Sequence, residues 1–75
     1  MAEYGIAALG PRLKQVRLDH GYKQYVVAQK LNLSKGSLCH FERGQRHPSL
    51  ETLIKLCNFY DLSPEELLIK ETNHS

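Results

Sequence analysis

Polar side chains that can form hydrogen bonds gather in one short stretch, SKGSLCHFERGQ, residues 34–45. A lysine ammonium can donate to guanine O6 and N7, while serine hydroxyls and imidazoles can donate or accept. Ser34 is suited to cap the start of a helix, and Gly44 is suited to end it. Between them only Leu38 and Phe41 are clearly apolar. The stretch therefore predicts a helix that buries one narrow stripe and displays its other side chains to solvent.

Histidine and cysteine side chains could instead bind a metal ion. The candidates are His20, His40, His47, His74, Cys39 and Cys57. Their spacing matches no standard zinc pattern, and the adjacent Cys39 and His40 would point in different directions on a helix. We therefore predict no metal site and no cofactor. Cys57 fits a core residue and Cys39 a plain surface thiol, with oxidation sensing by Cys39 as the less favoured alternative.

Catalytic chemistry has little support in the sequence. No nucleophile, base and acid occur at a recognisable spacing, and no glycine-rich phosphate loop is present. A chain of 75 residues forms one small domain with little room for a deep substrate cleft. We therefore do not expect an enzyme.

The composition is that of an ordinary globular domain, with 41% apolar and 24% charged residues. No apolar run approaches the roughly 18–20 residues that cross a bilayer. The first ten residues, MAEYGIAALG, lack the basic start and long apolar run of a signal peptide. We expect a cytoplasmic protein without membrane contact.

Positive charge is concentrated in the body of the chain. Residues 11–55 hold nine Lys or Arg against three Asp or Glu, a net charge of +6, whereas the whole chain carries only +2. Such an asymmetry favours a polyanionic partner for the body of the chain. A solvated surface on which the charges happen to fall this way is the simpler alternative.

Apolar residues recur at three- and four-residue spacing, which predicts helices and no strands. The first helix is expected from about Pro11 to Gly21, and the second from about Gln24 to Leu31. The third is the stretch at 34–44. The chain is expected to divide into an N-terminal arm at 1–10, a helical domain at 11–69 and a flexible C-terminal tail at 70–75.

Two further helices are expected in the C-terminal third. Ser49 is suited to cap the fourth helix, which ends at Asp61. Ser63, Pro64 and Glu66 form a strong start signal for the fifth, because they can make a capping box with proline at the first helical position. The apolar stripe expected on the fourth helix is Leu50, Leu53, Ile54, Cys57 and Tyr60.

The connection between the second and third helices, LNLS, is only a few residues long. Asn32 within it tolerates a left-handed backbone. A tight turn that holds two short helices at a steep angle is the helix-turn-helix arrangement. The helix at 34–44 would then stand out from the domain, and its displayed side suits the major groove of DNA, which is about 12 Å wide.

An ordered set of residues over 12–68 carries a family resemblance: Arg17, Gly21, Gln24, Ala28, Leu33, Ser34, Leu38, Glu42, Gly44, Pro48, Leu53, Leu62 and Leu67. On these residues the sequence resembles the phage repressor and Cro family of helix-turn-helix domains, the xenobiotic-response-element-type regulators. The resemblance implies a compact, all-α, five-helix, lambda-repressor-like fold. It also implies a sequence-specific transcription regulator, with repression as the expected mode, that binds double-stranded DNA as a dimer on a two-fold operator.

The resemblance also implies roles for individual residues. Base contacts are expected from Lys35, Gly36, Ser37, Cys39 and His40. Phosphate contacts are expected from Gln24, Lys23, Arg43, Gln45 and Arg46. In such families the residues at Arg17 and Glu42 pair across helices 1 and 3 and steady the recognition helix.

Several residues depart from the family pattern. Gly36 lies where the family often has a long reading side chain, so either the backbone approaches the bases or this base pair is not read. Lys23 replaces the usual Ser or Thr cap of the second helix. Asn32 and Asp61 replace turn glycines, and Tyr25 replaces a small or acidic residue on the outer side of the second helix.

A protein-interaction module that does not read DNA is the main rival interpretation. Its partner would be a protein such as a toxin or an antirepressor. A homodimer is expected to form through the C-terminal part, where Phe59, Tyr60 and the segment 62–69 offer apolar surface. Simple core packing of the same residues is an equally weighted alternative.

Overall fold

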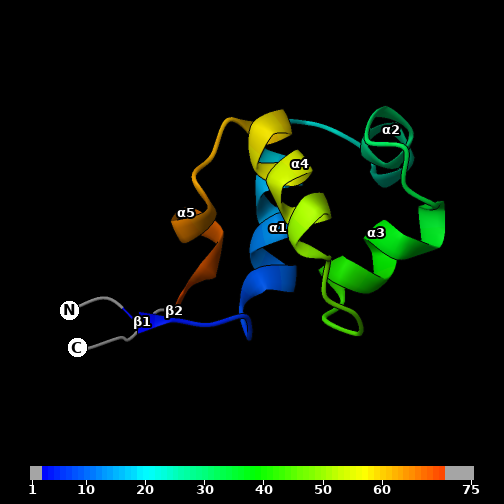
Figure 1. Cartoon of the computed structure of the whole chain (residues 1–75). Coiled ribbons are helices and arrows are strands. Elements are labelled where there is room, and N and C mark those ends of the chain that lie inside the picture. The colour runs from blue at the N-terminus through cyan, green and yellow to red at the C-terminus, as the bar shows by residue number, and fades with distance from the viewer. Residues whose placement is uncertain (1–2, 71–75) are drawn as a thin grey trace.

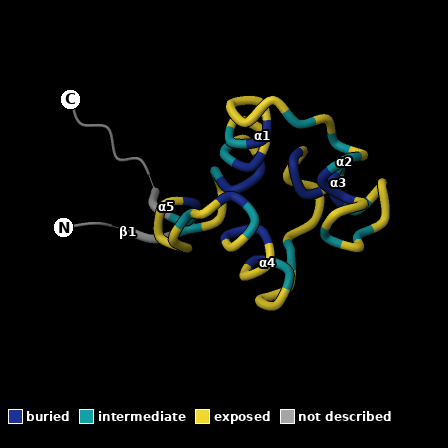
Figure 2. Tube along the Cα trace, turned by 90° about the horizontal axis from the view of Figure 1, so that it is seen from above, coloured by how far each residue is buried: buried dark blue, intermediate teal, exposed yellow. Residues whose placement is uncertain are grey.

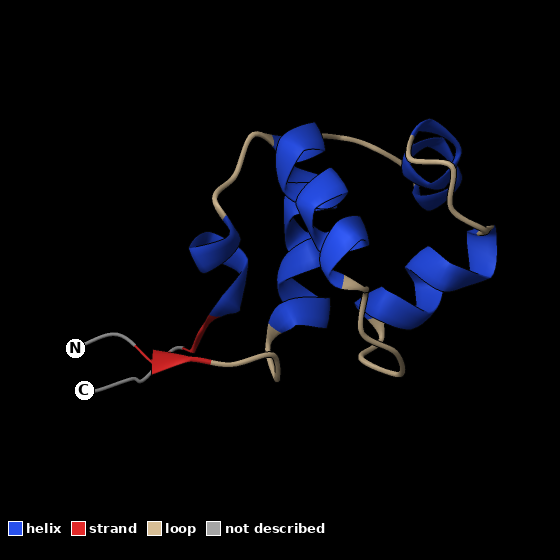
Figure 3. Ribbon diagram, in the orientation of Figure 1, coloured by secondary structure: helices blue, strands red, loops and turns tan. Residues whose placement is uncertain are grey.

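The computed structural model describes residues 3–70, and five helices form the body of this part of the chain (Figures 1 and 3). The helices are α1 (Leu9–Asp19), α2 (Gln24–Lys30), α3 (Lys35–Glu42), α4 (Leu50–Tyr60) and α5 (Pro64–Leu68). Two short strands, β1 (Glu3–Tyr4) and β2 (Ile69–Lys70), pair antiparallel, with Glu3 opposite Lys70 and Tyr4 opposite Ile69. The all-α, five-helix fold is confirmed, but the prediction of no strands was wrong.

The helix starts follow their capping residues as predicted. The Ser34 hydroxyl accepts a hydrogen bond from the backbone N–H of Ser37 at 3.1 Å, and Ser49 does the same for Thr52 at 3.2 Å. At α5 the backbone N–H of Ser63 donates to Glu66 Oε2 at 2.8 Å, which is half of a capping box. Lys23 precedes α2 without a side-chain cap.

The turns between helices adopt the left-handed backbone conformation that their residues allow. Asn32 and Asp61 have φ of 57° and 58°, while Gly21 and Gly44 have 75° and 76°. Asn and Asp are the residues besides Gly that most readily take this conformation, since their short polar side chains can hydrogen-bond locally. The replacement of glycine at Asn32 and Asp61 therefore leaves both turns intact.

The core is formed by apolar side chains from all five helices. In Figure 2 the parts of the trace coloured as buried lie toward the middle of the helical body. Its buried members are Leu9, Leu13, Val27, Ala28, Leu38, Phe41, Leu53, Leu56, Cys57, Tyr60 and Leu67. Burial raises the pKa of the Cys57 thiol and raises the pKa of Tyr60 to about 12. The interpretation of Cys57 as a core residue is confirmed.

Two details of the helices differ from the prediction. α1 begins at Leu9, two residues before Pro11, within the expected N-terminal arm. On α4, Leu50 and Ile54 are exposed, at 74% and 47%, and Leu56 is fully buried instead. Residues 53, 56, 57 and 60 already make a complete helical stripe against the core, so the side chains beside that stripe face solvent. Of the expected tail, residues 71–75 lie outside the described residues.

The C-terminal residues proposed for dimerisation are largely used within the monomer. Tyr60 and Leu67 are buried in the core, and Phe59, Leu62 and Leu68 pack against it. Their packing holds α5 to the body of the domain. Core packing, the alternative interpretation, is what the structure has for Tyr60 and Leu67, and the C-terminal dimer surface stays a prediction for the half-buried Phe59, Leu62 and Leu68.

The start of α1 touches the end of α3 at Gly10. A Cβ at this position would lie 2.6 Å from the carbonyl oxygen of Phe41 and 2.8 Å from that of Glu42. Both atoms are backbone, so the two helices would have to separate to admit a side chain. Gly10 thereby fixes the close approach that anchors the C-terminal end of α3.

We expect Gly10→Ala to lower the free energy of unfolding by about 1–3 kcal/mol, the usual cost of overpacking. Gly36→Ala is the matched control, because it is also a helical glycine and its Cβ would meet only His40 Cε1, at 4.0 Å. The control should gain up to about 0.5–1 kcal/mol from helix propensity. Urea unfolding of both variants tests the contact, and a Gly10→Ala protein as stable as Gly36→Ala would contradict it.

Candidate nucleic-acid interface

The turn between α2 and α3 holds the two helices against each other at one side of the domain (Figure 1). The backbone N–H of Leu33 donates to the carbonyl of Ala28 at 2.8 Å, which closes the turn around the left-handed Asn32. Leu38 and Phe41 are buried and anchor α3 to the core. This is the predicted helix-turn-helix, with α3 buried along one narrow stripe only.

The polar residues predicted to contact bases fall into two groups. Lys35, Gly36 and His40 are exposed, whereas Ser37 and Cys39 are half-buried. The Ser37 hydroxyl shares a hydrogen bond of 2.7 Å with the hydroxyl of the capping Ser34. Lys35 and His40 are therefore the members of this set with freely displayed polar side chains.

The cationic residues predicted to contact phosphates surround α3. Lys23 is exposed just before α2, and Arg43 and Arg46 are exposed just after α3, with Gln45 between them. With Lys35 at its start and Arg43 and Arg46 after its end, α3 has exposed positive charge at both ends, and Lys23 adds another just before α2. A polyanion that lies along α3 would meet positive charge at each end of the helix.

A buried ion pair links α1 to α3. The Arg17 guanidinium donates from Nε to Glu42 Oε2 at 2.7 Å and from Nη2 to Oε1 at 3.0 Å. Arg17 and Glu42 are only 7% and 6% exposed. The hydrogen bond to Glu42 raises the pKa of Arg17, so the guanidinium stays charged. The contact that the family resemblance implied is present, in the bidentate geometry that favours arginine.

Two further hydrogen bonds extend this ion pair toward the turn. Arg17 Nη1 donates to the carbonyl of Tyr22 at 2.8 Å, and Gln24 Nε2 donates to Glu42 Oε1 at 3.0 Å. α1, the start of α2 and the end of α3 are thereby fixed to one carboxylate. Sequence reasoning missed this bond of Gln24, whose amide was expected at a phosphate. The feature of the sequence that could have indicated this bond is a residue with a side-chain amide, Gln24, at the start of α2.

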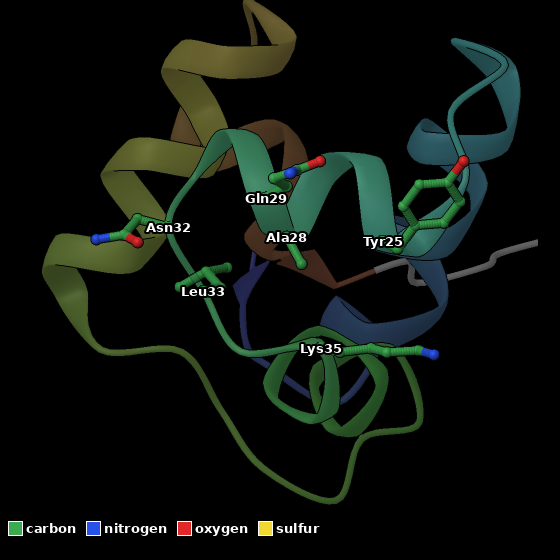
Figure 4. A pocket seen from close by; sticks show the side chains of 6 residues that line it. All are labelled: Tyr25, Ala28, Gln29, Asn32, Leu33 and Lys35. Carbon is green, nitrogen blue, oxygen red and sulfur yellow. The ribbon is translucent and has the colours of Figure 1, made fainter.

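An open pocket of about 400 Å³ lies between α2 and the start of α3 (Figure 4). It is lined by Tyr25, Ala28, Gln29, Asn32, Leu33 and Lys35. Tyr25 is 57% exposed, and its side chain extends to the same side of the pocket as that of Lys35. Tyr25 was not among the predicted contact residues, although a large aromatic side chain on the outer face of a short helix marks it in the sequence.

The candidate metal ligands are not brought together. Among residues 3–70 no three His, Cys, Asp or Glu side chains are placed to hold one ion, and His74 lies outside the described residues. His20 instead stacks on Tyr22 and bonds the carbonyl of Val16 at 2.9 Å. In this part of the chain no helix is long and apolar enough to cross a membrane.

Two short helices joined by a tight turn, with the second anchored by a narrow stripe, define a helix-turn-helix domain. The helix-turn-helix family model matches residues 13–67, and the chain belongs to this family in its phage repressor and Cro-type branch. The family consists of regulators and not of enzymes, in agreement with the sequence.

Curated relatives support the same assignment. The chain is 44% identical over 64 residues to the HTH-type transcriptional regulator ImmR of Bacillus subtilis. The matched segment covers 85% of this chain and 50% of ImmR. The chain thus spans about half the length of the curated relatives it matches.

Solved structures of similar fold include protein–DNA complexes. SinR in complex with DNA superposes with a TM-score of 0.73 at 33% identity, over 79% of this chain and 95% of the chain in that structure. The P22 c2 repressor in complex with a synthetic operator superposes with a TM-score of 0.76 at 25% identity. The superposition covers 80% of this chain and 91% of the repressor chain in that structure. A chain of the SinR–SinI complex superposes with a TM-score of 0.74 at 34% identity, over 80% of this chain and 59% of that longer chain.

Proposed function

We propose that this chain binds a specific double-stranded DNA sequence and regulates transcription, with repression as its mode. The observation that carries this proposal is the displayed polar face of α3, which the buried Arg17–Glu42 pair holds at the edge of the domain. The likeness to SinR bound to DNA and to the P22 c2 repressor bound to an operator supports the same conclusion.

α3 enters the major groove with its start and outer face toward the bases. Lys35 and His40 are the principal base contacts, since their side chains are exposed and can donate to base edges. Ser37 and Cys39, which are half-buried, approach the bases less closely. Gly36 is exposed and has no side chain, so Gly36 itself reads the base pair opposite it through its backbone or not at all.

Phosphate contacts position the domain on the duplex. Lys23 before α2 and Arg43, Gln45 and Arg46 after α3 face the two strands that border the groove. The amide of Gln24, already bonded to Glu42, supports this surface from behind and adds a phosphate contact only through its remaining hydrogen-bonding capacity.

Two copies occupy a two-fold operator, with half-sites about one helical turn, roughly 34–36 Å, apart. A single α3 reads only a few base pairs. A symmetric site read twice supplies the specificity that one small domain lacks.

Selection of binding sites from a random duplex pool with the purified chain tests the proposed function. We expect enrichment of a two-fold symmetric sequence at physiological salt. Only general, salt-sensitive affinity without an enriched sequence would contradict operator reading. That result would favour the alternative function, binding to a protein partner such as a toxin or an antirepressor. The SinR–SinI complex is the observation that supports this alternative.

Tyr25 is expected to add a contact at the edge of the groove, its hydroxyl donating to a phosphate. Tyr25→Phe should weaken binding to the enriched duplex roughly fivefold, because one hydrogen bond is lost while the ring remains. Leu18→Ala, which alters an exposed apolar residue on α1, is the control. Fluorescence anisotropy titration measures both, and equal affinities of the two variants and the unaltered chain would exclude the contact.

A further inference from the structure

Gly36 and His40 share one face of α3, because residues four apart lie one above the other on a helix. Both residues are exposed. A Cβ at Gly36 would lie 4.0 Å from Cε1 of the His40 imidazole. The imidazole therefore lies beside the space that a side chain at position 36 would enter, and a long side chain there would compete with it for that space.

The direction of helical side chains explains this placement of the imidazole. Helical side chains lean toward the N-terminus of their own helix, so each one covers the surface of the turn before it. Four helical residues rise about 6 Å, and base pairs stack about 3.4 Å apart. Residues 36 and 40 would therefore face base pairs about two steps apart if both side chains pointed straight outward. The lean of His40 toward Gly36 reduces this offset.

The ring nitrogens of His40 are available for a ligand. Within residues 3–70 no hydrogen bond to either of them is found, whereas the ring of His20 bonds the carbonyl of Val16 at 2.9 Å. A neutral imidazole has one donor and one acceptor nitrogen. It can therefore pair with either kind of group on the base edges of the major groove. The imidazole beside Gly36 is free to bind the base edge that faces position 36.

We propose that His40 reads the base pair opposite Gly36, in place of the side chain that Gly36 lacks. This inference rests on the proposed function. Gly36 is then a specificity-determining residue because of its small size, since it leaves the imidazole the room to reach that base pair. Reading by the backbone of Gly36 would need no imidazole, so the two modes of reading predict different results for variants of His40.

Binding-site selection with two variants tests this assignment. His40→Ala removes the imidazole, and the base preference at one pair of each half-site should fall about fivefold, as expected for one hydrogen bond. Gly36→Gln introduces an amide that prefers adenine and takes the space of the imidazole. The pair at which Gly36→Gln selects adenine identifies the base pair opposite position 36. We expect it to be the same pair at which His40→Ala loses its preference.

Gly36→Ala is the matched control. Its methyl group would be in ordinary van der Waals contact with Cε1 of His40, at 4.0 Å, so the imidazole keeps its place. We expect Gly36→Ala to retain the base preferences of the unaltered chain, and melting curves verify that every variant folds. Loss of the preference in Gly36→Ala but not in His40→Ala would show that the backbone of Gly36 reads the pair. That result would overturn the assignment to His40.

The double variant Gly36→Gln, His40→Ala should select the same sites as Gly36→Gln alone, because the amide has already replaced the imidazole at that pair. If Gly36→Gln selects adenine at one pair and keeps the preference that depends on His40 at another, the two residues read different pairs and the proposal is wrong. Gly36→Asn, whose shorter amide also pairs with adenine, serves if Gly36→Gln does not bind. Failure of the unaltered chain to enrich any sequence would instead contradict the proposed function.

Discussion

Glu42→Ala is expected to lower the free energy of unfolding by about 3–5 kcal/mol, because it leaves the buried Arg17 guanidinium without its counter-ion. The same change removes the acceptor of Gln24 and so releases the start of α2. For a domain of this size, each 1 kcal/mol corresponds to about 4–8 °C in the melting temperature. Calorimetry or thermal circular dichroism measures the loss.

Two further variants make this prediction decisive even if Glu42→Ala does not fold. Asp19→Asn alters the exposed hydrogen bond between Gln15 and Asp19 and should change stability by less than about 0.5 kcal/mol. The double variant Arg17→Met, Glu42→Leu removes both charges and should be more stable than Glu42→Ala. A Glu42→Ala protein that matches Asp19→Asn in stability would show that the ion pair contributes little.

Lys35→Ala is expected to weaken binding to the enriched duplex by about 10- to 100-fold, the equivalent of about 1–3 kcal/mol for one specific base contact. The same variant should tolerate substitution of one base pair in each half-site that the unaltered chain rejects. Lys14→Ala, with an exposed lysine on α1, is the control of equal charge. If Lys35→Ala and Lys14→Ala lose the same affinity for every DNA sequence tested, Lys35 does not contact a base.

Arg43→Ala should behave differently from Lys35→Ala. A phosphate contact carries no sequence information, so its loss should weaken binding uniformly across sequences. It should also reduce the slope of log affinity against log salt by about one. The two variants thus separate positioning contacts from reading contacts on the same helix-turn-helix.

Local signals explain why most of the fold could be predicted. Ser34, Ser49 and Glu66 cap helices through bonds to residues three positions away, and Asn32 shapes the turn by its own backbone preference. Such interactions depend on neighbours in the sequence and are therefore visible in it. The helix-turn-helix itself follows from two of these signals placed close together.

The features that the sequence did not reveal depend on distant residues. Strands of two residues, as in β1 and β2, are too short to show an alternating pattern, and they form because the segment before α1 lies beside the segment after α5. The approach of Gly10 to Phe41 joins positions 31 residues apart, and Gln24 reaches Glu42 across 18. The spacing of Leu50 and Ile54 matches a helical stripe. These two side chains are nevertheless exposed, because Leu53, Leu56 and Leu67 occupy the core.

Methylation interference on the enriched duplex is the most direct test of the claim that α3 reads bases in the major groove. Dimethyl sulfate methylates guanine at N7, in the major groove, and adenine at N3, in the minor groove. We predict that methylation of guanine N7 within each half-site blocks binding, whereas methylation of adenine N3 there does not. Interference confined to adenine N3 would place the protein in the minor groove and contradict the proposed role of α3.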